Sequence, residues 1–170
     1  MKGKIDQILV FEVGGQTFGM DVDLVVSVNK EQALTSMPQQ IPSVLGVTWW
    51  QGMCLPVYSL RQRFGLPGEL PGQKPGAVLL ARSGIPGDKL QVALPIDGVK
   101  EICDLKQQDL IQVPEILAAQ ENDYLEGVAH VGKALISLVD PGNLVPKDRR
   151  KELEEMVKKI EAEGEGKNGE

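Results

Sequence analysis

Short apolar runs rich in valine, isoleucine and leucine follow one another along most of the chain, separated by glycine and proline. The first run covers residues 8–13 and is followed by Gly14-Gly15 and a second run at 16–22. A Gly-Gly pair supplies the positive φ angles of a two-residue hairpin turn, so two antiparallel strands are predicted here. Further runs of this kind lie at residues 44–50, 53–58, 77–81, 90–96 and 99–103. The pattern predicts a mainly β protein with many tight turns.

The strand-rich part of the chain contains an internal repeat. An aspartate and two branched apolar residues recur at one spacing: Asp23, Val25 and Val28 correspond to Asp97, Val99 and Ile102. The repeat predicts two units of roughly 65 to 75 residues, which are marginally stable alone, so we expect them to pack face to face as two small β-barrels. Alternation along the strands predicts these core residues: Val47, Leu55 and Val57 in one barrel, and Val92, Leu135 and Leu138 in the other.

The C-terminal segment has a different pattern. From about Lys147 it is rich in charge, and Leu153, Met156, Val157 and Ile160 follow the i, i+3, i+4, i+7 spacing of one helix face. We predict an amphipathic helix over residues 147–163 and a polar, disordered tail at 164–170. The apolar face is expected to dock on the body of the protein, with a partner's groove or a frayed helix as alternatives.

Composition and charge narrow the class of protein. The chain has 170 residues, 42% of them hydrophobic and 25% charged, which is typical of a folded globular protein. Its net charge of −6 gives no general attraction to the phosphate backbone, so nucleic acid is not an expected partner. No apolar segment approaches the roughly 18 residues that a membrane span needs, so we expect no direct membrane insertion and a cytoplasmic location.

Residues that could support catalysis or bind metal are scarce. His130 is the single histidine and lies in a predicted strand, and zinc-binding spacings of Cys and His are missing from the sequence. Cys54 and Cys103 lie far apart in apolar surroundings, so both are expected to be reduced thiols. We therefore expect a binding protein with no catalytic residues, no cofactor and no metal, and not an enzyme.

Two adjacent tryptophans, Trp49 and Trp50, lie in a predicted strand. Neighbours on a strand point to opposite faces, so one ring is expected in the core and the other at the surface. An exposed tryptophan next to a glycine turn is typical of an interface anchor. The alternative is that both rings pack under a loop or between the two units.

Several segments resemble one known family. They are F-G-M-D-V near Phe18, P-Q-Q-I-P-S-V-L-G-V, G-M-C-L-P-V-Y-S-L-R-Q-R-F-G-L-P, I-D-G-V-K-E-I and Y-L-E-G-V. This combination resembles the CheW-like family of bacterial chemotaxis coupling proteins over residues 8–146. The resemblance implies two intertwined, five-stranded SH3-like β-barrels, with strands exchanged between the repeated units. It also implies a non-enzymatic scaffold that joins the cytoplasmic tip of methyl-accepting chemoreceptors to a CheA-type histidine kinase.

The chain departs from the family pattern at charged positions. Ser27, Gln51 and Ser59 stand where the family typically has Glu, Arg and Asp, and Trp49-Trp50 replaces a common Asn-Leu. The resemblance gives the following candidate partner-binding residues: Ser27, Trp49, Trp50, Gln51 and Arg61. Two other functions stay open: a divergent CheW-like module with another signalling partner, and a small ligand-binding or enzymatic barrel.

Overall fold

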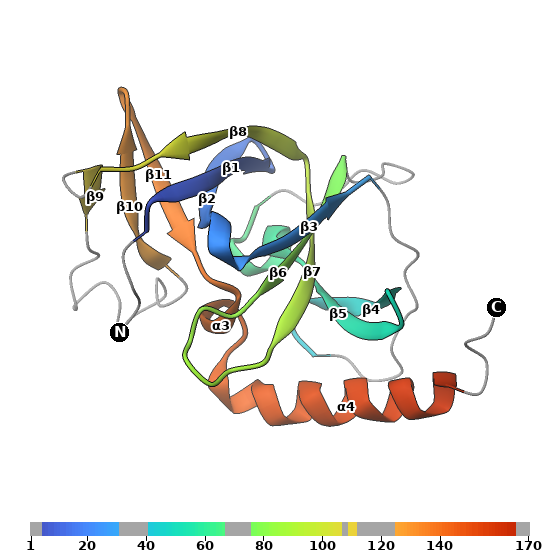
Figure 1. Ribbon diagram of the computed structural model, residues 1–170. Coiled ribbons are helices and arrows are strands. Elements are labelled where there is room, and N and C mark those ends of the chain that lie inside the picture. Colours follow the sequence, from blue (N-terminus) through green and yellow to red (C-terminus); the bar gives the residue numbers. More distant parts are fainter. Residues whose placement is uncertain (1–4, 31–40, 67–75, 107–108, 112–124, 166–170) are drawn as a thin grey trace.

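Two β-sheets form most of the molecule in the computed structural model, which describes residues 5–30, 41–66, 76–106, 109–111 and 125–165 (Figure 1). In sheet order, sheet A contains β8 (Gly98–Asp104), β1 (Gln7–Val13), β2 (Gln16–Asp21), β11 (Ala134–Val139), β10 (Leu125–Val131) and β9 (Leu110–Ile111). Sheet B contains β3 (Val25–Asn29), β6 (Ala77–Arg82), β7 (Gln91–Ile96), β5 (Met53–Tyr58) and β4 (Val44–Trp50). The described helical segments are η1 (Val22–Leu24), α1 (Leu60–Arg63), α3 (Pro141–Leu144) and α4 (Lys147–Glu165). The prediction of a mainly β protein is confirmed.

The described sheets differ from the expected pair of closed, five-stranded barrels. Sheet A has six strands because the two-residue strand β9 pairs with β10. Among the described pairings, β8 and β9 are the edges of sheet A, and β3 and β4 are the edges of sheet B. Both described sheets are therefore open.

Each sheet combines strands from both halves of the chain. The β1–β2 hairpin lies between β8 and β11, so the first hairpin of the chain completes the sheet of the C-terminal half. The β6–β7 hairpin occupies the same place in sheet B, between β3 and β5. The strand orders β3-β6-β7-β5-β4 and β8-β1-β2-β11-β10 are equivalent under the sequence repeat. The two repeats have thus exchanged their hairpins.

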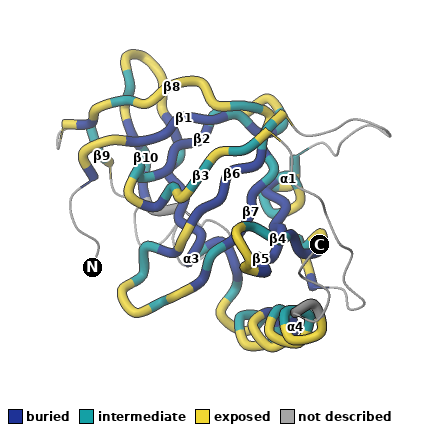
Figure 2. Tube along the Cα trace, turned by 45° about the vertical axis from the view of Figure 1, so that its right-hand side comes forward, coloured by how far each residue is buried: buried dark blue, intermediate teal, exposed yellow. Residues whose placement is uncertain are grey.

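Buried apolar side chains of the described residues form three clusters. Alternation along β1 divides its side chains: Ile8 and Val10 belong to the core of sheet A, whereas Phe11 belongs to the central core that the two sheets share. The core of sheet B contains Leu55 and Val57. Figure 2 shows buried stretches in dark blue along β1, β2, β6 and β7. The central core holds the two sheets together.

Two of the predicted core positions are wrong. Val92 is buried, but it lies in sheet B, in the strand next to β5, rather than in the other sheet, because the β6–β7 hairpin is exchanged. Its side chain faces the central core, whereas Leu55 and Val57 of β5 belong to the sheet B core. Leu135 is 63% exposed. Its neighbour Ile136 is buried in the core of sheet A, so alternation turns Leu135 to the opposite face near the start of β11. Val47, Leu55, Val57 and Leu138 are buried as predicted.

Helix α4 packs along one side of sheet B (Figures 1 and 2). Leu153 and Met156 are buried in the central core, which confirms that the apolar face docks on the protein itself. The helix extends to Glu165, into the segment expected to be disordered, and residues 166–170 of that segment lie outside the described residues. No helix in the described ranges is long and apolar enough to cross a membrane.

Candidate protein-interaction surfaces

The turn between β4 and β5 carries three of the predicted partner-binding residues. Trp50 and Met53 are cross-strand partners, so Gln51 and Gly52 form a two-residue hairpin loop. Both loop residues have positive φ angles, 48° for Gln51 and 79° for Gly52, as a primed hairpin turn requires. Glycine adopts this conformation freely, and the exposed Gln51 adopts it at some cost in backbone energy. The turn is therefore tight, and it presents the Gln51 amide to solvent.

Trp49 and Trp50 lie on opposite faces of β4, and both are half-buried. Trp50 packs against the sheet B core, which contains Leu55 and Val57. Trp49 is the cross-strand partner of Cys54 and shares its face of the sheet. The expected division into one core ring and one surface ring is therefore wrong, because each ring is partly covered and partly accessible.

Arg61 lies in an ion pair that joins distant parts of the chain. Its guanidinium is 2.7 Å from Oδ1 of Asp97, and the other carboxylate oxygen accepts the Gly14 N–H at 2.9 Å. One carboxylate thus links α1, the β1–β2 turn and the start of β8. This arrangement gives Arg61 a structural role in addition to any contact with a partner. The sequence analysis named Asp97 as part of the repeat but did not predict these contacts, because Asp97 is 36 residues from Arg61 and 83 from Gly14.

Ser27 lies away from the other candidate residues. It is in β3, opposite Leu80 of β6, at the edge of sheet B farthest from β4 in strand order. The described structure therefore does not bring the five candidate residues into one site: Trp49, Trp50 and Gln51 are neighbours, whereas Ser27 and Arg61 lie elsewhere. Ser59, another departure from the family pattern, accepts the Gln62 N–H at 3.2 Å and caps α1. Serine and aspartate are both good N-cap residues, so this change keeps the local structure while removing a charge.

Two edge strands that are equivalent under the repeat, β3 and β8, expose apolar side chains. In β3, Val26 and Val28 are 36% and 42% exposed, and in β8, Val99 and Ile102 are 41% and 59% exposed. β3 is an edge of sheet B, and β8 is the equivalent edge of sheet A. Edge strands with exposed branched side chains are ready to associate with other chains unless a partner covers them.

A groove of about 600 Å³ lies between part of α4 and sheet B. Its walls come from β5, the loop that precedes β7, and the middle turns of α4. Inside it, the backbone N–H of Cys54 donates to Oε2 of Glu161 at 3.1 Å. Burial, with the nearby Glu161 carboxylate as a second cause, raises the pKa of the Cys54 thiol to about 11, so the thiol is protonated at neutral pH. In the described ranges, His, Cys, Asp and Glu side chains do not gather in groups of three that could hold a metal ion.

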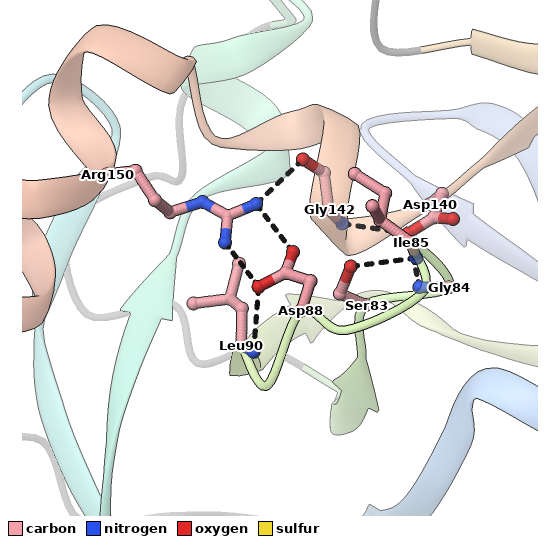
Figure 3. Close-up of polar contacts among 8 residues, drawn as sticks. All are labelled: Ser83, Gly84, Ile85, Asp88, Leu90, Asp140, Gly142 and Arg150. Atoms are coloured by element: carbon pink, nitrogen blue, oxygen red, sulfur yellow. Dashed lines mark hydrogen bonds and ion pairs between the residues drawn. The ribbon is translucent and has the colours of Figure 1, made fainter.

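The other end of α4 is fixed by a largely buried ion pair (Figure 3). The two terminal nitrogens of Arg150 bind the two oxygens of Asp88 at 2.7 Å each, and Arg150 also donates to the Gly142 carbonyl at 3.0 Å. Only 16% of the Arg150 side chain and 14% of the Asp88 side chain are exposed. The hydrogen bonds from Arg150 hold the pKa of Asp88 at about 2, well below its ordinary value. The sequence analysis missed this pair, because 62 residues separate its members.

Asp140 completes the junction between α3 and the β6–β7 loop. Its side chain is fully buried, and one carboxylate oxygen accepts the N–H groups of Gly142, at 2.8 Å, and Gly84, at 3.0 Å. A side chain at Gly142 would collide with the side chains of Ser83 and Ile85 unless these moved, so this position favours glycine. The base of α4 is therefore held by a closely packed polar junction.

Comparison with known proteins places this arrangement in a family. The chain matches the CheW-like domain over residues 7–149, which include every described strand and α3. The chain belongs to the CheW-like domain family. The CheW-like match ends near the start of α4, so most of this helix lies beyond the shared domain.

Individual relatives match most of the chain. It is 22% identical to the chemotaxis protein CheW of Klebsiella aerogenes over 152 residues, which are 89% of each protein. It is 25% identical to the chemotaxis protein CheW of Rhizobium meliloti over 144 residues, which are 85% of this chain and 90% of that protein. A crystal structure of the scaffolding protein TtCheW from Thermoanaerobacter tengcongensis is similar in fold, with a TM-score of 0.67 and 21% identity, over 81% of this chain and 90% of that one.

Proposed function

We propose that this chain is a coupling adaptor of bacterial chemotaxis, which joins methyl-accepting chemoreceptors to a CheA-type histidine kinase and catalyses no reaction itself. The observation that carries the proposal is the CheW-like domain over residues 7–149, in a chain whose curated relatives are named chemotaxis proteins CheW. The crystallised protein of similar fold, TtCheW, is described as a scaffolding protein. Because both proposed partners act in the cytoplasm, the proposal places the chain there.

The exposed apolar edges support docking of the kinase. A CheA-type kinase is expected to present a homologous barrel, and a barrel that ends in an edge strand can pair with β3 or β8 through branched apolar side chains. Ile102 is 59% exposed and is the most accessible of these residues, so we expect it to contribute to kinase binding.

The β4–β5 turn is the proposed contact for the receptor. The resemblance places an arginine where this chain has Gln51, and an amide makes weaker hydrogen bonds to a carboxylate than a guanidinium does. The half-buried rings of Trp49 and Trp50 offer apolar area beside the turn instead. Receptor binding by this chain is therefore expected to depend less on salt than binding through arginine would.

Reconstitution tests the proposal. The purified chain is mixed with the CheA-type kinase and the cytoplasmic fragment of a chemoreceptor from the same organism, and kinase autophosphorylation and co-sedimentation are measured. We expect the receptor to change kinase activity only when this chain is present. A chain that binds neither protein at tens of micromolar contradicts the proposal and favours another signalling partner.

Three variants test the surfaces. Ile102→Asp is expected to weaken kinase binding at least tenfold without unfolding the chain, whereas Leu135→Asp, an equally exposed leucine outside the edge strand, serves as the matched control. Gln51→Arg is expected to strengthen receptor binding and make it fall with added salt. If Gln51→Arg leaves the salt dependence unchanged, the turn does not contact the receptor.

A further inference from the structure

The β4–β5 hairpin has little support from the rest of sheet B. β5 pairs with β4 along its whole length, but its pairing with β7 is limited to Val57 and Ala93. Between Val57 and the turn, the second edge of β5 therefore faces the groove and α4. Without another contact on that side, this end of the hairpin would be held to the rest of the protein by the packing of Trp50 and Leu55 in the sheet B core, with no hydrogen bond from the second edge of β5.

Glu161 supplies a contact at this open edge. Backbone N–H groups point alternately to the two sides of a strand, and that of Cys54 points away from β4 to the Glu161 carboxylate. Pro56, the next residue on the same edge, has no N–H to donate. Between the turn and the pairing with β7, the described part of this β5 edge therefore offers one N–H donor, that of Cys54. The charged Glu161 carboxylate accepts its hydrogen bond.

The helix that carries Glu161 is fixed at its other end. Arg150 binds Asp88 with two hydrogen bonds, and Leu153 is fully buried in the central core. Glu161 lies about three helical turns further on, which corresponds to roughly 16 Å along the axis. Figure 1 shows α4 running from below α3 to the side where β4 and β5 lie. A helix is stiff over this length, so the junction at Arg150 sets the position of Glu161.

We propose that α4 is a rigid spacer that positions the β4–β5 turn, with Glu161 as the positioning residue and the Asp88–Arg150 pair as the fixed end. This inference rests on the proposed function of the turn as a receptor contact. It assigns a role to a helix that lies largely outside the CheW-like domain match. The groove beside the contact leaves the hairpin room to move when the hydrogen bond is broken.

Local measurements test the positioning without any partner. The two tryptophans of the chain, Trp49 and Trp50, are both in this hairpin, so fluorescence excited selectively at tryptophan, and not at the two tyrosines, reports on it alone. Glu161→Ala is expected to speed hydrogen exchange of the Cys54 amide about tenfold, as loss of a charge-assisted hydrogen bond predicts, and to increase quenching of tryptophan by acrylamide. Glu161→Gln, which keeps a weaker acceptor, is expected to fall between Glu161→Ala and the wild type. Glu163→Ala, an exposed change in the same helix, is the control and should behave as the wild type.

The outcomes separate this inference from the proposed function. Exchange of the Leu9 and Val10 amides in β1 should stay unchanged, which shows that any effect is local. If Glu161→Ala leaves the Cys54 amide and the tryptophans unchanged, Glu161 does not position the turn. If Arg150→Lys, which loses the paired hydrogen bonds, changes exchange only in the β6–β7 loop, then α4 is not a rigid spacer. Failure of the wild-type chain to bind the receptor fragment would contradict the proposed function, and the exchange result would still decide the role of Glu161.

Discussion

The ion pair between Asp88 and Arg150 makes a defined contribution to stability that depends on pH. The pKa of Asp88 is about 2 in the folded chain, against an ordinary value of 3.8, and the first cause is its hydrogen bonding to Arg150. A tenfold change in proton affinity corresponds to about 1.4 kcal/mol, so the lowered pKa corresponds to about 2 kcal/mol of folding free energy. Because the folded-state pKa lies below the unfolded one, this stabilisation is complete above about pH 4 and is lost as the pH falls toward 2.

Asp88→Asn is the perturbation that tests this reasoning. It keeps the shape of the side chain but leaves the Arg150 charge largely buried without its carboxylate, so we expect a loss of about 2 to 4 kcal/mol at pH 7. The assay is urea denaturation of wild type and variant at pH 7 and at pH 2.5, followed by circular dichroism. The difference between the two proteins should shrink by about 1 to 2 kcal/mol at the lower pH, because the Asp88 carboxylate of the unfolded wild-type chain then binds a proton while that of the folded chain is still mostly ionised.

Asp6→Asn serves as the control, since it changes an exposed aspartate and should alter stability by less than about 0.5 kcal/mol at either pH. An equal difference between wild type and Asp88→Asn at both pH values would refute the reasoning, because it would mean that the Asp88 carboxylate gains no charge-dependent stabilisation from Arg150.

Three further predictions concern the cores, the Arg61 ion pair and the thiols. Val57→Asp places an unpaired charge in the core of sheet B, so circular dichroism should show an unfolded chain. Arg61→Met should lower stability in urea by about 1 kcal/mol, whereas Lys100→Met, which breaks a more exposed and longer ion pair, should have no measurable effect. With a thiol reagent at pH 8, the half-buried Cys103 should react first, and the buried Cys54, with a pKa of about 11, should react only on unfolding.

The strand pattern and the repeat could be read from the sequence because both depend on local spacing. Alternation placed Val47, Leu55 and Val57 in a core, and the same rule applied to Ile136 would have turned Leu135 outward. The error at Val92 has a different origin. Its burial followed from local pattern, but its sheet depends on where the β6–β7 hairpin pairs, and pairing is a property of the whole fold.

The polar contacts that shape the candidate surfaces could not be predicted in this way. Cys54 and Glu161 are 107 residues apart, and Arg61 and Asp97 are 36 apart, with no spacing rule that links them. Exposed charged residues are common in any soluble chain, so the few that form buried or bidentate pairs have no local signal. The departures from the family pattern at Trp49, Trp50 and Gln51 did single out a turn, but only the structure shows both rings half-buried.

The exchange of hairpins has a consequence for how an adaptor can work. Each sheet needs two strands from the other repeat, so the sheets cannot separate without breaking β-pairing on both sides of a hairpin. The central core, which includes Phe11 from one sheet and Leu94 from the other, further fixes them. The exposed edges β3 and β8 are thus held in one relative orientation. A scaffold that holds two partners in a fixed relative orientation needs this rigidity. If the two sheets could move against each other, a partner bound at one edge would not fix the position of a partner at the other, and ordering the sheets would cost part of the binding free energy.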